Sequence, residues 1–307
     1  MMRSALLKAA GSPRLRTFAE HSALTRPVVR RFVAGDSLDD ALTVAHDLVT
    51  DRYVSLDHLG ENTLDRAGAD ETTAAYLTLL HRLAREGLAG RAEVSVKLSA
   101  LGQALPGDGV SVSTDNAAKI CAAAAEIGTT VTVDMEDHTT TDATLDTVLT
   151  LRRDWPSTGA VLQAYLHRTA DDCAALAGPG SRVRLCKGAY AEPASVAHQD
   201  RSAVDDSYRR CLRVLMAGEG YPMVATHDPA LIELAVQMGG ELAAGREYEL
   251  QMLHGVRPLA QRELAAAGHR LRVYLPYGSA WYPYFMRRLG ERPANLAFFL
   301  RSFATRG

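Results

Sequence analysis

The sequence has few cysteines, few lysines and no long apolar run, and each shortage narrows what the protein can be. Its four cysteines form no CxxC pair and show no regular spacing, so reduced thiols in the cytoplasm are expected rather than a disulfide framework. No stretch is long and apolar enough to span a bilayer. The net charge of −2 supplies no basic field for nucleic acid, which excludes the usual electrostatic basis of nucleic-acid binding.

What is present is a large apolar fraction and an unusual basic composition. The 307 residues are 47% hydrophobic, enough for one large core or two smaller ones. Only four of the 34 basic residues are lysine, and Lys97 and Lys187 both lie in apolar, strand-like runs. The first 35 residues are rich in arginine and poor in acids, a composition compatible with a transit peptide. Without a clear cleavage signal, we expect one or two short helices packed outside the main domain.

After a helix predicted over residues 37–50, strand-like and helical patterns alternate along the chain. Eight such units over about 250 residues fit a (βα)8 barrel better than an open sheet. No GxGxxG or GxxxxGK[ST] motif follows the first strand, which argues against dinucleotide-binding and P-loop folds. We therefore predict a helical segment over 1–50 and a barrel over 51–307. The expected strands are 54–59, 93–101, 130–136, 160–165, 182–187, 222–226, 248–252 and 271–275, and the expected helices lie near 71–88, 114–127, 142–154, 169–177, 203–218, 229–239, 256–268 and from 279 onward.

Polar side chains interrupt four of these strands. A parallel strand buried on both faces is normally an apolar run, yet Lys97, Asp134, Gln163 and Arg184 stand late in theirs. Each of these residues alone is as compatible with an ion pair inside the barrel as with a functional role. Because catalytic groups of such barrels collect at the carboxyl ends of the strands, the four together predict a binding site.

The last helix carries a second group of charges. Tyr284, Arg287, Arg288 and Glu291 are spaced i, i+3, i+4 and i+7 and therefore share one face. A solvated face with an internal Arg–Glu pair is one interpretation, and a clamp for a carboxylate or phosphate is the other. We expect the helix, capped by Ser279, to lie against the barrel mouth. Pairing Lys97 with Asp134 and Arg287 with Glu291 would leave two positive charges for an anionic ligand.

Two loops have features that suit a nucleotide-like cofactor. Gly188, in the sequence Lys187-Gly188-Ala189-Tyr190, lets backbone approach a ligand closely. Thr226-His227-Asp228-Pro229 ends the sixth strand and begins a helix, whose N-terminal N–H groups favour phosphate. A capping role for His227 is equally open.

In combination these motifs resemble the flavin-dependent proline dehydrogenases. The resemblance covers about 250 residues in the correct order. It is carried by SVKLSALG, VTVDMED, LQAY, Arg184 with KGAY, Thr226-His227, Gln251-Met252-Leu253, VYLPYG and Arg287-Arg288-x-x-Glu291. One departure is Ala191-Glu192-Pro193, where many bifunctional members have tryptophan. The length implies the monofunctional type.

The resemblance implies a distorted (βα)8 barrel with its last helix over the mouth. It also implies that FAD oxidises L-proline to Δ1-pyrroline-5-carboxylate and passes electrons to a quinone, with no metal. The enzyme would be cytoplasmic with peripheral contact to the inner membrane face, and the basic N-terminal segment is a candidate for that contact. By the same resemblance, the catalytic residues would be Asp134 and Arg184. The substrate carboxylate would be bound by Lys97, Arg287 and Arg288, its ring would be enclosed by Tyr190, Leu253 and Tyr274, and Glu291 would position an arginine. The residues in contact with FAD would be Met135, Gln163, Arg184, Lys187, Gly188, Ala189, Thr226 and His227.

Three rival functions fit parts of the pattern. Lys97 or Lys187 would be the Schiff-base nucleophile of an aldolase-type barrel. Asp134, Glu136, His138 and His227 would serve a metal-dependent hydrolase, although a helical turn after Glu136 is expected to carry His138 away. A barrel that only binds its ligand is the third.

Overall fold

The protein folds as a closed barrel of parallel strands, as the alternating pattern predicts. The computed structural model describes residues 29–242 and 246–291. Each strand pairs in parallel with the next along the chain, and β8 closes the ring against β1. The barrel strands are β1 (Tyr53–His58), β2 (Ala92–Val96), β3 (Val131–Val133), β4 (Gly159–Gln163), β5 (Arg182–Cys186), β6 (Tyr221–Ala225), β7 (Glu249–Leu253) and β8 (Leu271–Tyr277).

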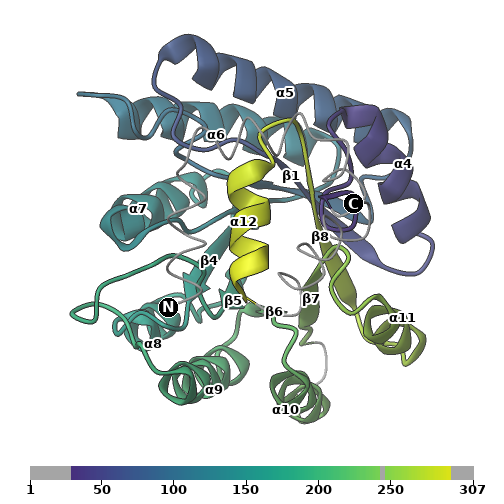
Figure 1. Ribbon diagram of the computed structural model, residues 1–307, viewed down its shortest axis with the longest axis vertical. Helices are drawn as coiled ribbons and strands as arrows, with labels where there is room; N and C mark the ends of the chain where they lie inside the picture. The colour runs from purple at the N-terminus through teal and green to yellow at the C-terminus, as the bar shows by residue number, and fades with distance from the viewer. Residues whose placement is uncertain (1–28, 243–245, 292–307) are drawn as a thin grey trace, which may run out of the picture.

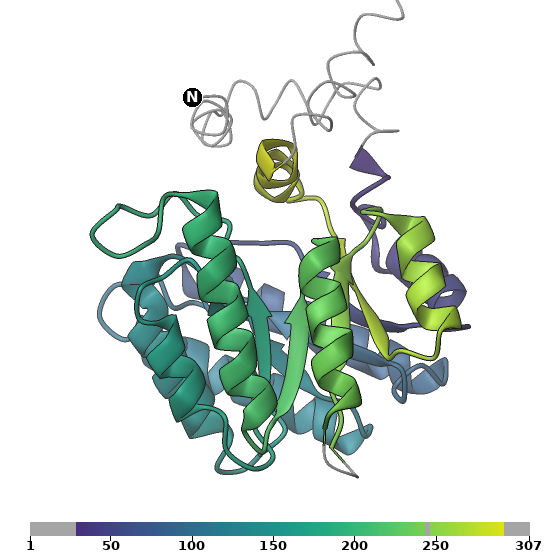
Figure 2. The same ribbon diagram turned by 90° about the horizontal axis from the view of Figure 1, so that it is seen from below.

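Helices cover the outside of the barrel, and one helix covers its end. The helix that follows β8 does not return to the outer ring; it crosses the middle of the barrel in the end-on view of Figure 1 and lies beyond the strands in Figure 2. The helices are α4 (Leu38–Leu48), α5 (Arg66–Arg85), α6 (Gly109–Glu126), η1 (His138–Thr140), α7 (Thr141–Leu151), α8 (Thr169–Ala175), α9 (Arg201–Ala217), α10 (Pro229–Gly240), α11 (Pro258–Ala266) and α12 (Tyr282–Glu291). None of the helices in the described ranges is long and apolar enough to cross a membrane.

Helix α4 occupies the position in the outer ring of helices that α12, lying over the mouth, does not fill. Its buried face contributes Ala41, Leu42, Ala45 and Leu48 to the same core cluster as residues of β1 and β8. The helix begins at a capping box, in which Ser37 and Asp40 satisfy each other's backbone N–H groups. Thus α4 closes the flank of the barrel between its first and last strands. The predicted division at residue 50 remains a prediction, and residues 1–28 lie outside the described part.

The alternation of strand residues explains both the core and the site. Along β2, Val94 and Val96 join the apolar cluster under the helices, whereas Glu93 and Ser95 bond to other strands inside the barrel. Successive side chains of a strand point to opposite sides of the sheet. Because the apolar side chains face the helices, the polar ones must line the barrel interior. A polar interior can be stable only if its groups are paired.

Several predicted boundaries and caps need correction. β2 ends at Val96 rather than at residue 101, because a turn closed by Leu101 N–H donating to Leu98 O follows it. α6 begins at Gly109 rather than near residue 114. α12 begins at Tyr282, which leaves Ser279 in the preceding turn. The predicted start of α10 at Asp228-Pro229 is confirmed, with the Asp228 carboxylate accepting from Ala230 N–H.

Candidate functional site

Arg184 is the centre of a polar network inside the barrel. Its guanidinium donates to Asp134 at 2.7 Å, to Ser95 at 2.9 Å and to Ser55 at 3.2 Å, so it joins β1, β2 and β5 to the residue that follows β3. Only 5% of its side chain is exposed. The Tyr274 ring lies 5.4 Å from its guanidinium carbon, in cation–π range. The side chain is therefore fixed beneath the barrel mouth.

The charged side chains inside the barrel near the N-terminal ends of the strands also form ion pairs. Glu93 accepts from Arg182 at 2.7 Å and lies 3.7 Å from Arg272, whose guanidinium holds Glu249 at 2.7 and 3.0 Å. Burial opposes ionisation of Glu93, but Arg272, Arg182 and Arg184 together lower the pKa of its carboxyl. This end of the barrel is a neutralised salt-bridge network and gives the site a rigid base.

Lys97 follows β2 directly and lies at the mouth. Its ammonium donates to Asp57 at 2.7 Å, and Asp134, the partner expected from the sequence, is 3.7 Å away. Burial disfavours the charged ammonium, but Asp57 and Asp134 outweigh it and raise the pKa of Lys97. A Schiff-base nucleophile needs a neutral amine, so this environment argues against the aldolase-type reaction at Lys97.

Tyr274 connects Lys97 to Asp134. Its phenol donates to Asp134 at 2.7 Å, and the Lys97 ammonium is 3.4 Å from the phenol oxygen. Burial raises the pKa of Asp134, although Arg184 and Lys97 oppose that effect. Burial and the neighbouring Asp134 carboxylate raise the pKa of Tyr274, which keeps the phenol protonated. These contacts bring four of the predicted residues, including Arg184, into one continuous network.

Arg287 is held over this network from α12. Both oxygens of Glu61, in the loop after β1, accept from its guanidinium, with Nη1 and Oε2 separated by 3.0 Å. Its guanidinium carbon lies 5.6 Å from the centre of the Tyr190 ring. Arg288, beside it in sequence, is 9% exposed, and its guanidinium carbon lies 5.2 Å from the Tyr284 ring. Neither arginine projects into bulk water, as a solvated helix face would require.

Two carboxylates of this site were missed by the sequence reasoning. Asp57 and Glu61 pair with Lys97 and Arg287, so the expected surplus of two positive charges is too high. Glu291 ends α12, and its side chain lies outside the described part. The signal for Asp57 was available: it stands late in an apolar strand, as Lys97 and Asp134 do. Glu61 lies in a loop three residues after β1 and carried no such signal.

The residues predicted to bind a cofactor lie around the same mouth. Gln163 donates to the Glu136 carbonyl at 2.7 Å, and Met135, next to Glu136, is buried. Lys187 is held by Asp205 and, at 3.0 Å, by Asp228. Gly188 has φ +108°, a conformation that favours glycine, and precedes Ala189. The carboxyl ends of β3, β4 and β5 therefore supply one continuous part of the rim.

The β6–α10 loop continues that rim. The Thr226 hydroxyl accepts from Asp228 N–H at 3.2 Å, and His227 Nε2 accepts from Leu253 N–H at 2.9 Å. Because that nitrogen is an acceptor, His227 fixes the end of β7 and its residue Leu253. Asp228 rather than His227 caps α10, so the capping role considered for His227 is wrong, whereas its ligand-binding role remains a prediction.

The metal-dependent rival finds no support in the described residues. Within these ranges no group of three or more His, Cys, Asp or Glu side chains could hold a metal ion. His138 begins the short helix η1 and bonds to Glu192, which removes it from Asp134 and Glu136 as expected.

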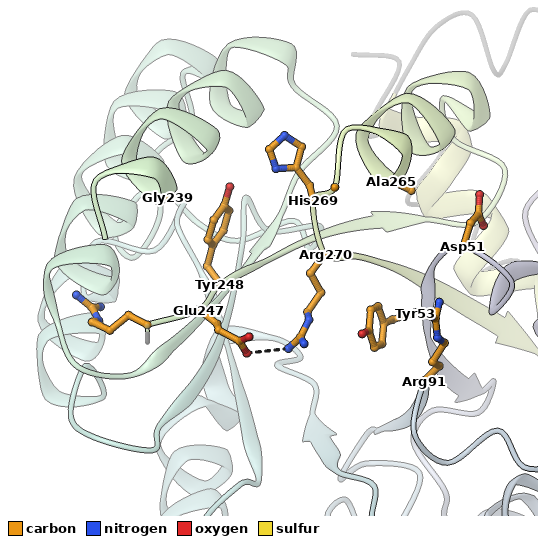
Figure 3. Close-up of a pocket in the computed structure, with 11 residues that line it drawn as sticks. Asp51, Tyr53, Arg91, Gly239, Glu247, Tyr248, Ala265, His269 and Arg270 are labelled. Carbon is orange, nitrogen blue, oxygen red and sulfur yellow. Dashed lines mark hydrogen bonds and ion pairs between the residues drawn. The ribbon is translucent and has the colours of Figure 1, made fainter. Parts of the chain in front are cut away.

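One cavity lies far from the network, and another adjoins it. One of about 510 Å³ is at the opposite end of the barrel, around the N-terminal ends of β1, β7 and β8; Tyr53, Arg91, Tyr248 and Arg270 are among its lining residues (Figure 3). That end of such barrels normally serves stability. The other, of about 350 Å³, lies between the Glu61 loop and the start of α12 and adjoins the mouth.

A closed (βα)8 barrel with paired charges at the carboxyl ends of its strands is the architecture of an enzyme with its site at that mouth. The profile of the proline dehydrogenase family matches residues 42–301, and the chain belongs to this family. The expected fold and resemblance are both confirmed.

Individual relatives agree over almost the whole chain. A proline dehydrogenase of Deinococcus radiodurans is 38% identical over 302 residues, covering 97% of this chain and 96% of that protein. Proline dehydrogenase 1 of Bacillus subtilis is 35% identical over 279 residues, covering 90% and 91%. A crystal structure of proline utilization A from Bdellovibrio bacteriovorus superposes with a TM-score of 0.79 at 20% identity, covering 93% of this chain and 38% of that one, and supports the fold. The relatives that match in length are thus separate proline dehydrogenases, as resemblance to the monofunctional type predicts.

Proposed function

We propose that the protein oxidises L-proline to Δ1-pyrroline-5-carboxylate, the first step of proline catabolism, with FAD accepting a hydride. The observation that carries the proposal is the approach of two elements far apart in the sequence. Arg287 of α12 shares its surroundings with Lys97 of the barrel, since Glu61, the ion-pair partner of Arg287, also raises the pKa of Lys97. A site with cations on both sides suits a small amino acid with a carboxylate.

The substrate carboxylate binds to Arg287, Arg288 and Lys97. The forked guanidinium of Arg287 already holds a carboxylate in the structure, that of Glu61, so its geometry suits such a ligand. Tyr190, Tyr274 and Leu253 form the wall of the ring pocket, and Glu291 positions an arginine. Tyr190 lies under Arg287, which supports its assignment to the pocket.

The donor set at the rim fits a flavin nucleotide. The buried guanidinium of Arg184, held by Asp134, would stabilise negative charge on the reduced flavin, and Gln163 and the Met135 backbone would bond to the flavin ring. Lys187 to Ala189, Thr226 and His227 would hold the ribityl and pyrophosphate parts of the flavin nucleotide, next to the N-terminus of α10. When bound, the flavin supplies the two-electron acceptor that the amino acid side chains lack.

The chain's own residues bind and orient the substrate. Removal of a hydride from proline C5 and of the proton from nitrogen gives the C=N bond of the product, so the amine must be neutral. Fixing the carboxylate aligns C5 and supplies much of the rate gain through positioning. No histidine belongs to the proposed substrate-binding set, so activity should rise from pH 6 to pH 9 as the free amine increases. A flat profile would contradict this mechanism.

The enzyme would pass the electrons taken from proline to a quinone at the cytoplasmic face of the membrane. Peripheral contact, with the basic N-terminal residues as its candidate, brings the enzyme to this acceptor. A variant lacking residues 1–35 should lose binding to vesicles; retained binding would show that this segment does not make the contact.

The proposed function is tested by a visible absorption spectrum of the purified protein. We expect flavin bands that bleach on addition of L-proline without oxygen, with formation of the pyrroline product. Glycine, which has the same carboxylate and no ring, should not bleach them. A colourless protein that cannot be loaded with FAD would refute the proposal.

A further inference from the structure

The segment between β5 and α9, residues 187–199, carries Tyr190 and bonds to the loop after β4, in which Tyr165 and His167 both contact it. Tyr165 N–H donates to the Lys187 carbonyl at 2.9 Å, and the Tyr165 carbonyl accepts from His198 N–H at 2.8 Å. The adjacent Leu166 forms an isolated antiparallel bridge with Ala197. Tyr165 therefore holds both ends of the segment through its backbone.

The side chain of Tyr165 holds the middle of the segment. Its ring lies against Gly188, where an added Cβ would be only 2.3 Å from ring atom Cδ1. Its hydroxyl donates to Glu192 Oε1 at 3.3 Å. Burial and the neighbouring Glu192 raise the pKa of Tyr165, so the phenol stays protonated and can donate.

Glu192 connects this tyrosine to a third loop. Its side chain is 4% exposed, and its carboxylate accepts from His138 N–H at 3.0 Å and contacts His138 Nδ1. A buried carboxylate is tolerated only when it is paired, so these bonds fix Glu192 and the backbone around it. Because Glu192 is two residues after Tyr190, the place of the Tyr190 ring depends on them.

We propose that Glu192, together with Tyr165 and His138, positions the Tyr190 ring beneath Arg287 and thereby sets the affinity of the site for its substrate. The three residues touch neither substrate nor reacting atoms; they act through Tyr190 and the Lys187–Ala189 backbone. The inference rests on the proposed function for its kinetic consequence but not for its structural one.

The linkage to Arg287 makes this more than a structural role. The Tyr190 ring is the surface on which the Arg287 guanidinium rests, 5.6 Å from its centre. A shift of the segment would remove a cation–π contact and one wall of the ring pocket together. Both losses weaken binding of proline, whereas the barrel network around Arg184 stays intact.

The test compares Tyr165→Phe and Glu192→Gln with the control Tyr221→Phe. The first keeps the ring against Gly188 and removes the hydroxyl. The control removes a phenol that donates to the buried Glu249 at 3.0 Å, the same kind of bond at the opposite end of the barrel. We expect hydrogen exchange in residues 187–199 to accelerate in both test variants and not in the control. We also expect KM for proline to rise about tenfold with kcat within twofold, while the control keeps its KM.

The two readouts separate failure of this inference from failure of the proposed function. Unchanged exchange over residues 187–199 in Tyr165→Phe and Glu192→Gln would overturn the positioning role, whatever the enzyme's activity. Accelerated exchange with a KM no higher than that of Tyr221→Phe would overturn the link to substrate affinity. Accelerated exchange in a protein that neither binds FAD nor oxidises proline would support the positioning role of these residues and refute the proposed function. A double variant whose effect on KM equals that of either single change would support a shared unit.

Discussion

Glu61 binds the guanidinium of Arg287 with both carboxylate oxygens, across the boundary between the barrel and its covering helix. The two side chains are 17% and 12% exposed. Burial opposes the charged guanidinium, but Glu61 outweighs it and raises the pKa of Arg287. The pair therefore shows which geometry the arginine offers to a carboxylate, and it gives the first prediction.

Arg287→Lys should raise KM for L-proline at least tenfold. An ammonium keeps the charge but loses the parallel N–H pair that a carboxylate needs. Steady-state kinetics at saturating acceptor will measure it. Arg270→Lys, at the other end of the barrel, is the matched control and should leave KM unchanged. A KM for Arg287→Lys within twofold of the parent value would remove this residue from the carboxylate clamp.

Asp57→Asn should destabilise the protein by on the order of 3 to 5 kcal/mol. The change leaves the Lys97 ammonium, 8% exposed, with Asp134 at 3.7 Å as the remaining partner among the described carboxylates. Urea unfolding followed by fluorescence will give the free energy. Asp51→Asn removes an acid that is 44% exposed and paired with Arg52, and should cost less than about 1 kcal/mol. Equal effects of the two changes would show that burial does not govern this pair.

Tyr274→Phe should lower kcat/KM about tenfold or more while the protein remains folded. The ring still forms its wall and its cation–π contact with Arg184, but Asp134 loses a 2.7 Å donor. The carboxylate then interacts more strongly with Lys97 and competes with the substrate for it. Substrate kinetics and a thermal unfolding curve measure the two effects separately. An unchanged kcat/KM would mean that the Lys97–Tyr274–Asp134 connection does not affect the site.

His254 gives a prediction for the dependence of stability on pH. Burial, with a further contribution from Arg52, lowers the pKa of His254 from 6.5 to about 4. A depressed pKa in the folded state means that the unfolded chain takes up the proton first as pH falls. The stabilising contribution is thus complete above pH 6.5 and lost as pH falls toward 4, and amounts to at most on the order of 3 kcal/mol. Replacing His254 by Gln should reduce the difference in unfolding free energy between pH 7 and pH 4.5. An identical difference in both proteins would contradict it.

The barrel could be predicted from the sequence because each strand is short, apolar on its outer face and separated by a helical pattern. Departures occur where local bonds end an element early. β2 stops at Val96 because the next residues turn, even though Leu98 and Leu101 continue the apolar pattern and are buried. The spacing of apolar residues indicates which residues are buried, and a buried turn can show the same apolar pattern as a buried strand.

The site could be predicted in part for a related reason. Lys97, Asp134 and Arg184 were conspicuous because a charge in a strand is rare, and the structure joins them directly. The partners of charges were harder to assign. Arg287 has an acid one helical turn away in sequence, but the ion pair found among the described residues is with Glu61, 226 positions distant. Only the fold brings these two residues together, so spacing along the chain could not reveal the pair.

Since α4 rather than α12 seals the seam between β8 and β1, the helix over the mouth contributes none of its described side chains to the main apolar core of the barrel. Trp281, just before α12, and Phe285, within it, pack with Val29, Phe32 and Val33 in a second apolar cluster. The sequence of α12 can therefore diverge through evolution without exposing the apolar flank of the barrel to water. Access to the site and the integrity of the fold are in this way controlled by different helices.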